Sequence, residues 1–318
     1  MHLDVHSHFL SMDFVKHMSG RSELPITVLE GGEYFVECGG ALRFEAGPHI
    51  VDMDTKLKDL EAMEVDLSIL SHGIPGPEVL APDEADYWAS KINDHLASII
   101  EAYPGKFLGW GTIGFGDPQR SVAELDRCVN ELGFKGMQLY ANIGGRVVDS
   151  PEFWPVYRRA AELGVALNLH PTIPLNRNGM DTRSLLSGLG FMYDTSLATM
   201  RLFDSGLFDE LPTLKFILPH VGGVLPYLRG RVERQRVGKP HPASDYFDLI
   251  YFDTVSYNME SLELCYKWIG PERMLYGTDH PFTPPTRFIA DMVEGLGCTP
   301  EEMEMIFHGN AERLLGLT

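Results

Sequence analysis

The sequence predicts an α/β fold of the (β/α)8 type, a TIM barrel. Short apolar runs alternate with longer segments whose apolar residues recur at helical spacing, which is typical of folds built around a parallel sheet. Eight such runs are present, and strands buried on both faces of a parallel sheet are almost continuously apolar. A length of 318 residues matches eight strand-and-helix units. We therefore expect one barrel domain over residues 1–318.

The eight expected strands follow one another along the chain. They are residues 2–6, 66–71, 107–113, 136–142, 165–170, 215–220, 249–256 and 274–279. A doubly wound open sheet is the competing architecture, but it usually carries a glycine-rich nucleotide-binding turn after its first strand. Here the first strand leads into His6-Ser7-His8-Phe9, so we favour the closed barrel.

Helical segments are expected between these strands. Residues 88–100 and 122–132 each place apolar side chains on one face, at spacings of three and four. A further helix has the clearest ends: Ser150 can cap it, Pro151 suits the first helical position, and Gly164 follows its last residue.

Two connections are too long to be simple turns. Residues 18–50 follow the first strand, and the apolar pieces 26–29 and 34–36 within them suggest a small inserted hairpin. Residues 171–194 follow the fifth strand and are rich in proline and glycine. Because connections after the carboxyl ends of barrel strands surround the active site, we expect both to act as lids or substrate walls.

Composition excludes several classes of partner. The formal net charge of −19 opposes binding to nucleic acids and to anionic membrane surfaces. No apolar run approaches the roughly eighteen residues of a membrane span, and the first residues carry no secretory pattern. The four cysteines, none in a C-x-x-C pair, suit a reducing compartment. We expect a cytoplasmic protein whose partner is a small molecule.

Side chains of the types that bind metal ions lie at the ends of four of the expected strands. His6 and His8 are two residues apart in the first strand, so both point to the same side. His170 ends the fifth strand, His220 the sixth and Asp279 the eighth. Because the ends of barrel strands meet at one mouth, the five side chains are expected to converge there. Imidazole and carboxylate groups together suit a divalent metal ion.

Longer motifs surround these residues. They are residues 4–9 (DVHSHF), 211–223 (LPTLKFILPHVGG), 277–282 (GTDHPF) and 309–317 (GNAERLLGL). Together they resemble the amidohydrolase superfamily over nearly the whole chain. The resemblance is to its branch of metal-dependent decarboxylases, which includes aminocarboxymuconate-semialdehyde decarboxylase and aromatic acid decarboxylases.

The resemblance implies a role for each residue. His6, His8, His170 and Asp279 would hold one divalent metal ion, zinc by preference, with manganese also accepted. His220 and Asp279 would be the catalytic groups. No lysine ends the fourth strand, so a second, lysine-bridged metal is not expected. Some of these decarboxylases carry glutamate at the position of His6, and there this chain departs from them. Related barrels commonly form homodimers, which is a further expectation.

The expected activity is decarboxylation of a small aromatic or unsaturated carboxylic acid. A divalent ion polarises carboxylate oxygens, and a histidine near neutrality is suited to moving a proton. One alternative is a hydrolase that cleaves a C–C, ester or amide bond with a metal-bound hydroxide. Another is a ligand-binding barrel without catalysis. The fold does not decide among them.

Four further residues are candidates for binding the substrate. Arg43 and His49 lie in the first long connection, His72 follows the second strand, and Phe282 follows the last. Arginine suits a carboxylate because it donates two parallel hydrogen bonds. For a single arginine such as Arg43, a solvated surface position is the alternative.

Overall fold

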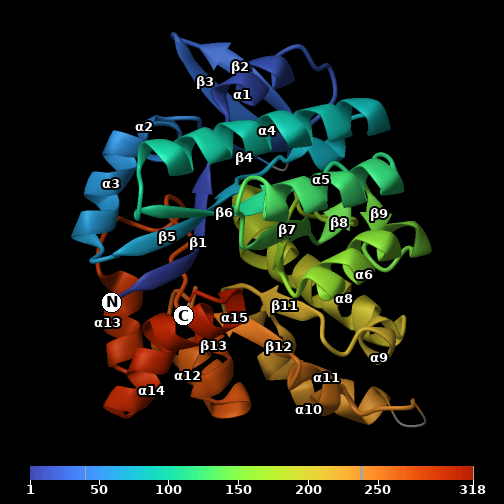
Figure 1. Cartoon of the computed structure of the whole chain (residues 1–318), viewed down its shortest axis with the longest axis vertical. Coiled ribbons are helices and arrows are strands. Elements are labelled where there is room, and N and C mark those ends of the chain that lie inside the picture. Colours follow the sequence, from blue (N-terminus) through green and yellow to red (C-terminus); the bar gives the residue numbers. More distant parts are fainter. Residues whose placement is uncertain (40, 237–238, 318) are drawn as a thin grey trace.

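The computed structural model describes residues 1–39, 41–236 and 239–317, and its centre is a ring of parallel strands (Figure 1). The strands are hydrogen-bonded in the order β1-β5-β6-β7-β10-β11-β12-β13. Their bounds are β1 (Leu3–Phe9), β5 (Leu67–His72), β6 (Phe107–Thr112), β7 (Gly136–Tyr140), β10 (Ala166–His170), β11 (Lys215–Leu218), β12 (Ile250–Asp253) and β13 (Met274–Leu275). All eight predicted strands are confirmed.

The ring closes between its last strand and its first. The amide of Val5 donates to the carbonyl of Tyr276 at 2.9 Å, and the amide of Asp279 donates to the carbonyl of His6 at 2.8 Å. These bonds leave neither β1 nor β13 as a free edge, so the sheet is a barrel and not a doubly wound open sheet. They also bring the residues that follow β13 against the histidines of β1.

Helices and short turns surround the ring (Figure 1). The longer helices are α3 (Met53–Ala62), α4 (Pro82–Ala102), α5 (Pro118–Asn130), α6 (Trp154–Leu163), α8 (Phe191–Asp204), α10 (Leu225–Gln235) and α12 (Met259–Ile269). The shorter ones are α1 (Met12–Met18), α2 (Pro48–Val51), α7 (Arg183–Leu185), α9 (Leu207–Glu210), α11 (Ala243–Phe247), α13 (Phe288–Glu294), α14 (Pro300–Glu304) and α15 (Asn310–Leu315). Among the described residues, no helix combines the length and apolarity needed to cross a membrane.

The helix expected after residue 150 begins differently from the prediction. Residues Pro151–Phe153 form a 3-10 turn, η2, and α6 starts only at Trp154. Its end agrees with the prediction, because Gly164 follows the last helical residue with a left-handed φ of 65°. Glycine adopts that conformation without a steric penalty.

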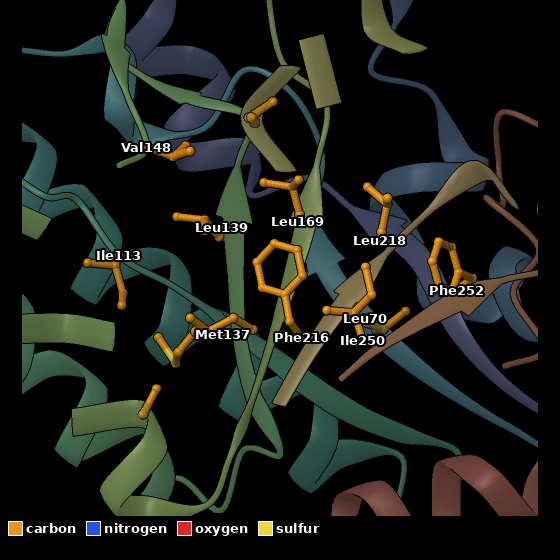
Figure 2. Packing of buried hydrophobic residues seen from close by; sticks show 14 of the residues in the cluster. Leu70, Ile113, Met137, Leu139, Val148, Leu169, Phe216, Leu218, Ile250 and Phe252 are labelled. Atoms are coloured by element: carbon orange, nitrogen blue, oxygen red, sulfur yellow. The ribbon is translucent and has the colours of Figure 1, made fainter. Parts of the chain in front are cut away.

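Successive side chains along the barrel strands point alternately toward the surrounding helices and toward the barrel interior. Met137, Leu139 and Leu169 point outward into the layer beneath the helices, where Figure 2 shows them beside Phe216. The residues between them point into the barrel, since successive side chains of a strand face opposite sides. His170, one residue after Leu169, therefore turns toward the barrel interior at its mouth.

Both long connections contain regular structure. The first holds an antiparallel sheet of three strands, β2 (Ile26–Glu30), β3 (Glu33–Gly39) and β4 (Leu42–Glu45). The predicted hairpin is thus confirmed and extended by one strand. The second connection holds α7, a π-helical turn η3 (Leu186–Gly190) and the start of α8.

A buried carboxyl group lies in the 3-10 turn η1 (Pro77–Val79). Glu78 is 3% exposed and accepts one hydrogen bond, from the hydroxyl of Thr172 at 3.2 Å. Its other oxygen has no partner among the described residues. Burial raises the pKa of Glu78 from 4.5 to about 8. The folded state therefore keeps this proton to a higher pH than the unfolded state does, and folding loses stability as the pH rises from 4.5 toward 8.

We expect Glu78→Gln, which places a neutral group of the same shape there, to remove this loss. At about pH 8.5 the variant should be more stable than the wild type by a few kcal/mol, since each pKa unit corresponds to roughly 1.4 kcal/mol. At about pH 5 the two should be nearly equal. Denaturant unfolding at the two pH values measures this. An equal change at both would show that Glu78 does not titrate as described.

Candidate metal centre

Four side chains from three strand ends converge at the mouth of the barrel. His6 and His8 come from β1, His170 ends β10, and Asp279 follows β13. One ligand atom from each lies within 4.8 Å of all the others. The Nε2 atoms of His6 and His8 are 3.1 Å apart and lie 3.4 and 3.2 Å from Oδ1 of Asp279. All four residues are buried.

Hydrogen bonds behind the ligands orient two of the imidazoles. Nδ1 of His6 lies 2.6 Å from Oδ2 of Asp253, and Nδ1 of His170 lies 2.7 Å from the carbonyl oxygen of Pro171. An ionised carboxylate and a carbonyl can only accept, so each Nδ1 carries the hydrogen. In the neutral ring each Nε2 then has a lone pair on the side of the other ligand candidates, which is the arrangement of metal-binding histidines.

The pKa shifts of the site describe two neutral imidazoles, an ionised Asp279 and a proton on His6 that a bound metal ion would have to displace. Burial lowers the pKa of His8 to about 4 and that of His170 well below its ordinary value, so both rings are neutral. Burial also opposes charge on His6, but the hydrogen-bonded carboxylate of Asp253 raises its pKa to about 9. Burial would raise the pKa of Asp279, yet the adjacent imidazoles of His220 and His8 hold it well below its usual range.

This donor set fits one divalent metal ion. Ligands about 2.0–2.1 Å from a tetrahedral ion lie about 3.3 Å from one another. The separations between His6, His8 and Asp279 run from 3.1 to 3.4 Å. Three imidazoles and one carboxylate are ligands that both zinc and manganese accept.

His220 lies beside the four ligand candidates on a strained turn. It follows β11 with a left-handed φ of 55°, and its Nε2 is 3.6 Å from Oδ2 of Asp279. Its amide donates to Oδ1 of Asp253 at 2.7 Å. Non-glycine residues adopt this conformation at a cost, so the surrounding contacts must hold it. Nδ1 of His220 is buried without a hydrogen-bond partner among the described residues.

Asp253 is the residue that sequence reasoning missed. Its two oxygens bind different parts of the site, Oδ2 the ring of His6 and Oδ1 the backbone of His220. Asp253 ends β12, within the seventh predicted strand. A polar residue at the end of an apolar strand is the same signal that identified His170, and it applies to Asp253 as well.

A cavity of about 740 Å³ opens above the centre. His170, His220 and Asp279 are among the residues that line it, and both long connections contribute walls. The apolar lining residues include Phe44, Ile50, Ile74, Phe191, Met192, Val255, Leu264 and Phe282. The cavity is large enough for a small aromatic molecule, because ligand pockets commonly measure some 300–1,000 Å³.

The four substrate-binding candidates are placed differently. His49 and Phe282 line the cavity. Arg43 does not, because the neighbouring β4 residues face the cavity and alternation turns Arg43 away. Its guanidinium instead pairs with Glu30 and Glu37. His72 is also absent from the walls.

Packing explains the position of His72. Its ring is buried edge-on against Phe9 and Phe14, and its Nδ1 lies 2.8 Å from the carbonyl oxygen of Gly73. The arginine that does line the cavity is Arg183, on the short helix α7. No sequence pattern distinguished it from the other arginines.

The family model described as amidohydrolase matches residues 4–317, from the strand that carries His6 and His8 to the last helix. The chain belongs to the amidohydrolase family. The resemblance in the sequence motifs is thereby confirmed, and so is the barrel predicted from the pattern of strands.

Several relatives of this amidohydrolase carry decarboxylase names. The 2-amino-3-carboxymuconate-6-semialdehyde decarboxylase of Dictyostelium discoideum is 28% identical over 84% of this chain and 77% of its own length. The gamma-resorcylate decarboxylase of Polaromonas sp. (strain JS666) is 30% identical over 83% of this chain and 87% of its own. A crystal structure of a dihydroxybenzoic acid decarboxylase from Polaromonas sp. JS666, with bound manganese and the inhibitor 2-nitroresorcinol, superposes with a TM-score of 0.84. It is 27% identical and covers 99% of this chain and 97% of that one.

Proposed function

We propose that this amidohydrolase is a metal-dependent carboxy-lyase that decarboxylates a small aromatic or unsaturated carboxylic acid. The observation that carries the proposal is the buried set of three histidines and one aspartate at the base of a largely apolar cavity, with His220 beside it. Relatives and a solved neighbour named as decarboxylases support it.

In this proposal His6, His8, His170 and Asp279 hold one divalent ion, zinc or manganese. The donor set supports both metals, and the manganese in the Polaromonas structure supports the second. When bound, such an ion polarises carboxylate and hydroxyl oxygens and offsets their negative charge. Asp253 keeps His6 in the tautomer that leaves Nε2 free for the metal.

His220 is proposed as the group that moves the proton. Decarboxylation breaks the bond between the carboxylate carbon and the ring or chain carbon, and the electron pair must be accepted there. His220 delivers a proton to that carbon, the C–C bond breaks, its electron pair restores the unsaturated system, and CO2 leaves. His220 then regains a proton from water. Asp279, 3.6 Å from its Nε2, stabilises the protonated imidazole.

The walls of the cavity support the same chemistry. Aromatic and aliphatic side chains such as Phe44, Phe191 and Phe282 face the space above the centre. They provide flat apolar surface for an aromatic ring and exclude water from the reacting carbon. His49 and Phe282 are the two predicted substrate-binding residues that we retain in the proposal.

Release of CO2 tests the proposed activity. The purified protein, loaded with zinc or manganese, is incubated with 2,6-dihydroxybenzoate and a panel of hydroxylated and unsaturated acids, and CO2 is measured together with loss of the acid. We expect equal amounts of CO2 and decarboxylated product from at least one acid. Cleavage of an ester or amide to a new carboxylate, with no CO2 from any acid, would establish the hydrolase alternative instead.

A further inference from the structure

A second group of polar side chains links His49, which lines the cavity, to His280, the residue after Asp279. Nδ1 of His49 lies 2.5 Å from Oδ2 of Asp59, and Nε2 of His280 lies 3.0 Å from the same oxygen. Nδ1 of His280 is 2.7 Å from Nζ of Lys56, which is also 3.1 Å from the hydroxyl of Ser7. We call His49, Asp59, His280 and Lys56 the histidine chain.

The histidine chain has the residue types of a metal site but not its spacing. Ligands of one tetrahedral ion lie about 3.3 Å apart, as at the metal centre, whereas His49 and Asp59 are 2.5 Å apart. Nδ1 of His280 is already hydrogen-bonded to the amine of Lys56, and a lysine beside a bound cation is electrostatically unfavourable. The chain is therefore held by hydrogen bonds.

The direction of each hydrogen bond follows from Asp59. An ionised carboxylate only accepts, so both Nε2 of His280 and Nδ1 of His49 carry hydrogen and donate to it. Nδ1 of His280 then accepts from Lys56. In a neutral His49 the remaining nitrogen, Nε2, has only a lone pair and is a hydrogen-bond acceptor.

Burial makes this arrangement rigid. Lys56 is 0% exposed and His280 is 1% exposed, and charged groups taken out of water are strongly destabilised once a partner is lost. Asp59 therefore stays where its two donors are. By contrast the side chain of His49 is 59% exposed and lines the cavity. Buried partners thus hold an exposed ring that lines the cavity.

We propose that His49 is a specificity-determining residue whose Nε2 accepts a hydrogen bond from a hydroxyl or amino substituent of the substrate, with Asp59 as its positioning residue. This inference rests on the proposed function for the class of ligand, an aromatic acid. It adds that the acid carries a hydrogen-bond donor besides its carboxylate. The three-stranded insertion and α2 that follows it would then select the substrate as well as cover it.

Binding of two acids that differ by one hydroxyl tests the proposal. The manganese-loaded protein is titrated in a calorimeter with 2-hydroxybenzoate, which has one hydroxyl donor, and with benzoate, which has none. We expect the wild type to bind 2-hydroxybenzoate about tenfold more tightly than benzoate, the effect of one well-placed hydrogen bond. His49→Phe, which keeps an aromatic ring but no acceptor, should bind both acids with similar affinity.

A matched control separates this effect from the loss of any histidine. His241 is 51% exposed, lies beside Asp245 and does not line the cavity. His241→Phe should keep the wild-type preference. The proposal would be overturned if His49→Phe lost affinity for both acids equally, or if the wild type bound both acids with equal affinity.

The role of Asp59 is tested by a double-mutant cycle. Asp59→Asn should reduce the preference in the wild-type background but leave it unchanged in the His49→Phe background. A reduction of the same size in both backgrounds would show that Asp59 does not act through His49. If the wild type binds neither acid, the ligand class is wrong and the proposal is overturned. If it binds them with the expected preference but releases no CO2 from any acid, only the proposed function fails.

Discussion

A variant with both His6→Ala and His8→Ala is expected to purify almost free of metal, whereas the wild type carries about one divalent ion per chain. The substitutions remove two of the four groups that converge on the centre. The loss of affinity should exceed the roughly 10–100-fold that follows removal of a hydrogen-bond partner behind a ligand. Elemental analysis of the two purified proteins measures the difference.

Thermal unfolding provides a second measurement of the same prediction. A ligand that binds only the folded state raises its stability, so added zinc or manganese should raise the melting temperature of the wild type after treatment with a chelator. It should not raise that of the double variant. A control variant with His17→Ala and His241→Ala also loses two histidines, neither of which belongs to the ligand group or lines the cavity, and should respond like the wild type. Metal retained by the His6/His8 variant would contradict the assignment of the site.

Replacement of His220 is expected to have the largest effect on the reaction itself. We choose His220→Asn because asparagine tolerates the left-handed backbone found at this position, where φ is 55°. The variant should retain about one metal ion per chain but lose about 10²–10⁴-fold in kcat, the typical contribution of a positioned acid or base. The substrate KM should change much less, since the other residues that line the cavity are unchanged.

The two measurements on His220→Asn separate its possible roles. Loss of metal along with activity would mean that His220 is itself a metal ligand. Unchanged kcat would mean that another group moves the proton. Metal content and kcat must therefore be determined on the same preparation.

Much of the site follows from short-range patterns. His6 and His8 are two residues apart on one strand, and His170 and Asp279 end apolar runs. A strand has a period of two, and a parallel barrel gathers the carboxyl ends of its strands at one mouth. These two rules need no knowledge of which residues touch. They explain why the predicted ligands converge in the structure, while their binding of a metal stays a prediction.

The same rules could not place the substrate-binding residues. Arg43 and His49 lie six positions apart in one insertion. Arg43 nevertheless turns away from the cavity and pairs with Glu30, whereas His49 lines the cavity and contacts Asp59. Which side of β4 faces the cavity depends on how the inserted sheet packs on the barrel. Sequence periodicity says that its residues alternate, but not which set faces inward.

What the sequence by itself determined was the barrel, the order of its strands and the five side chains at its mouth, because each depends on local periodicity and on the closure of a parallel sheet. Tertiary structure alone decided the partners of those side chains. Asp253 is 247 positions from His6, and Lys56 is 224 positions from His280. Such pairs form only when distant strands become neighbours, so hydrogen bonding in the folded chain sets the tautomer of His6, the left-handed turn at His220 and the orientation of His49.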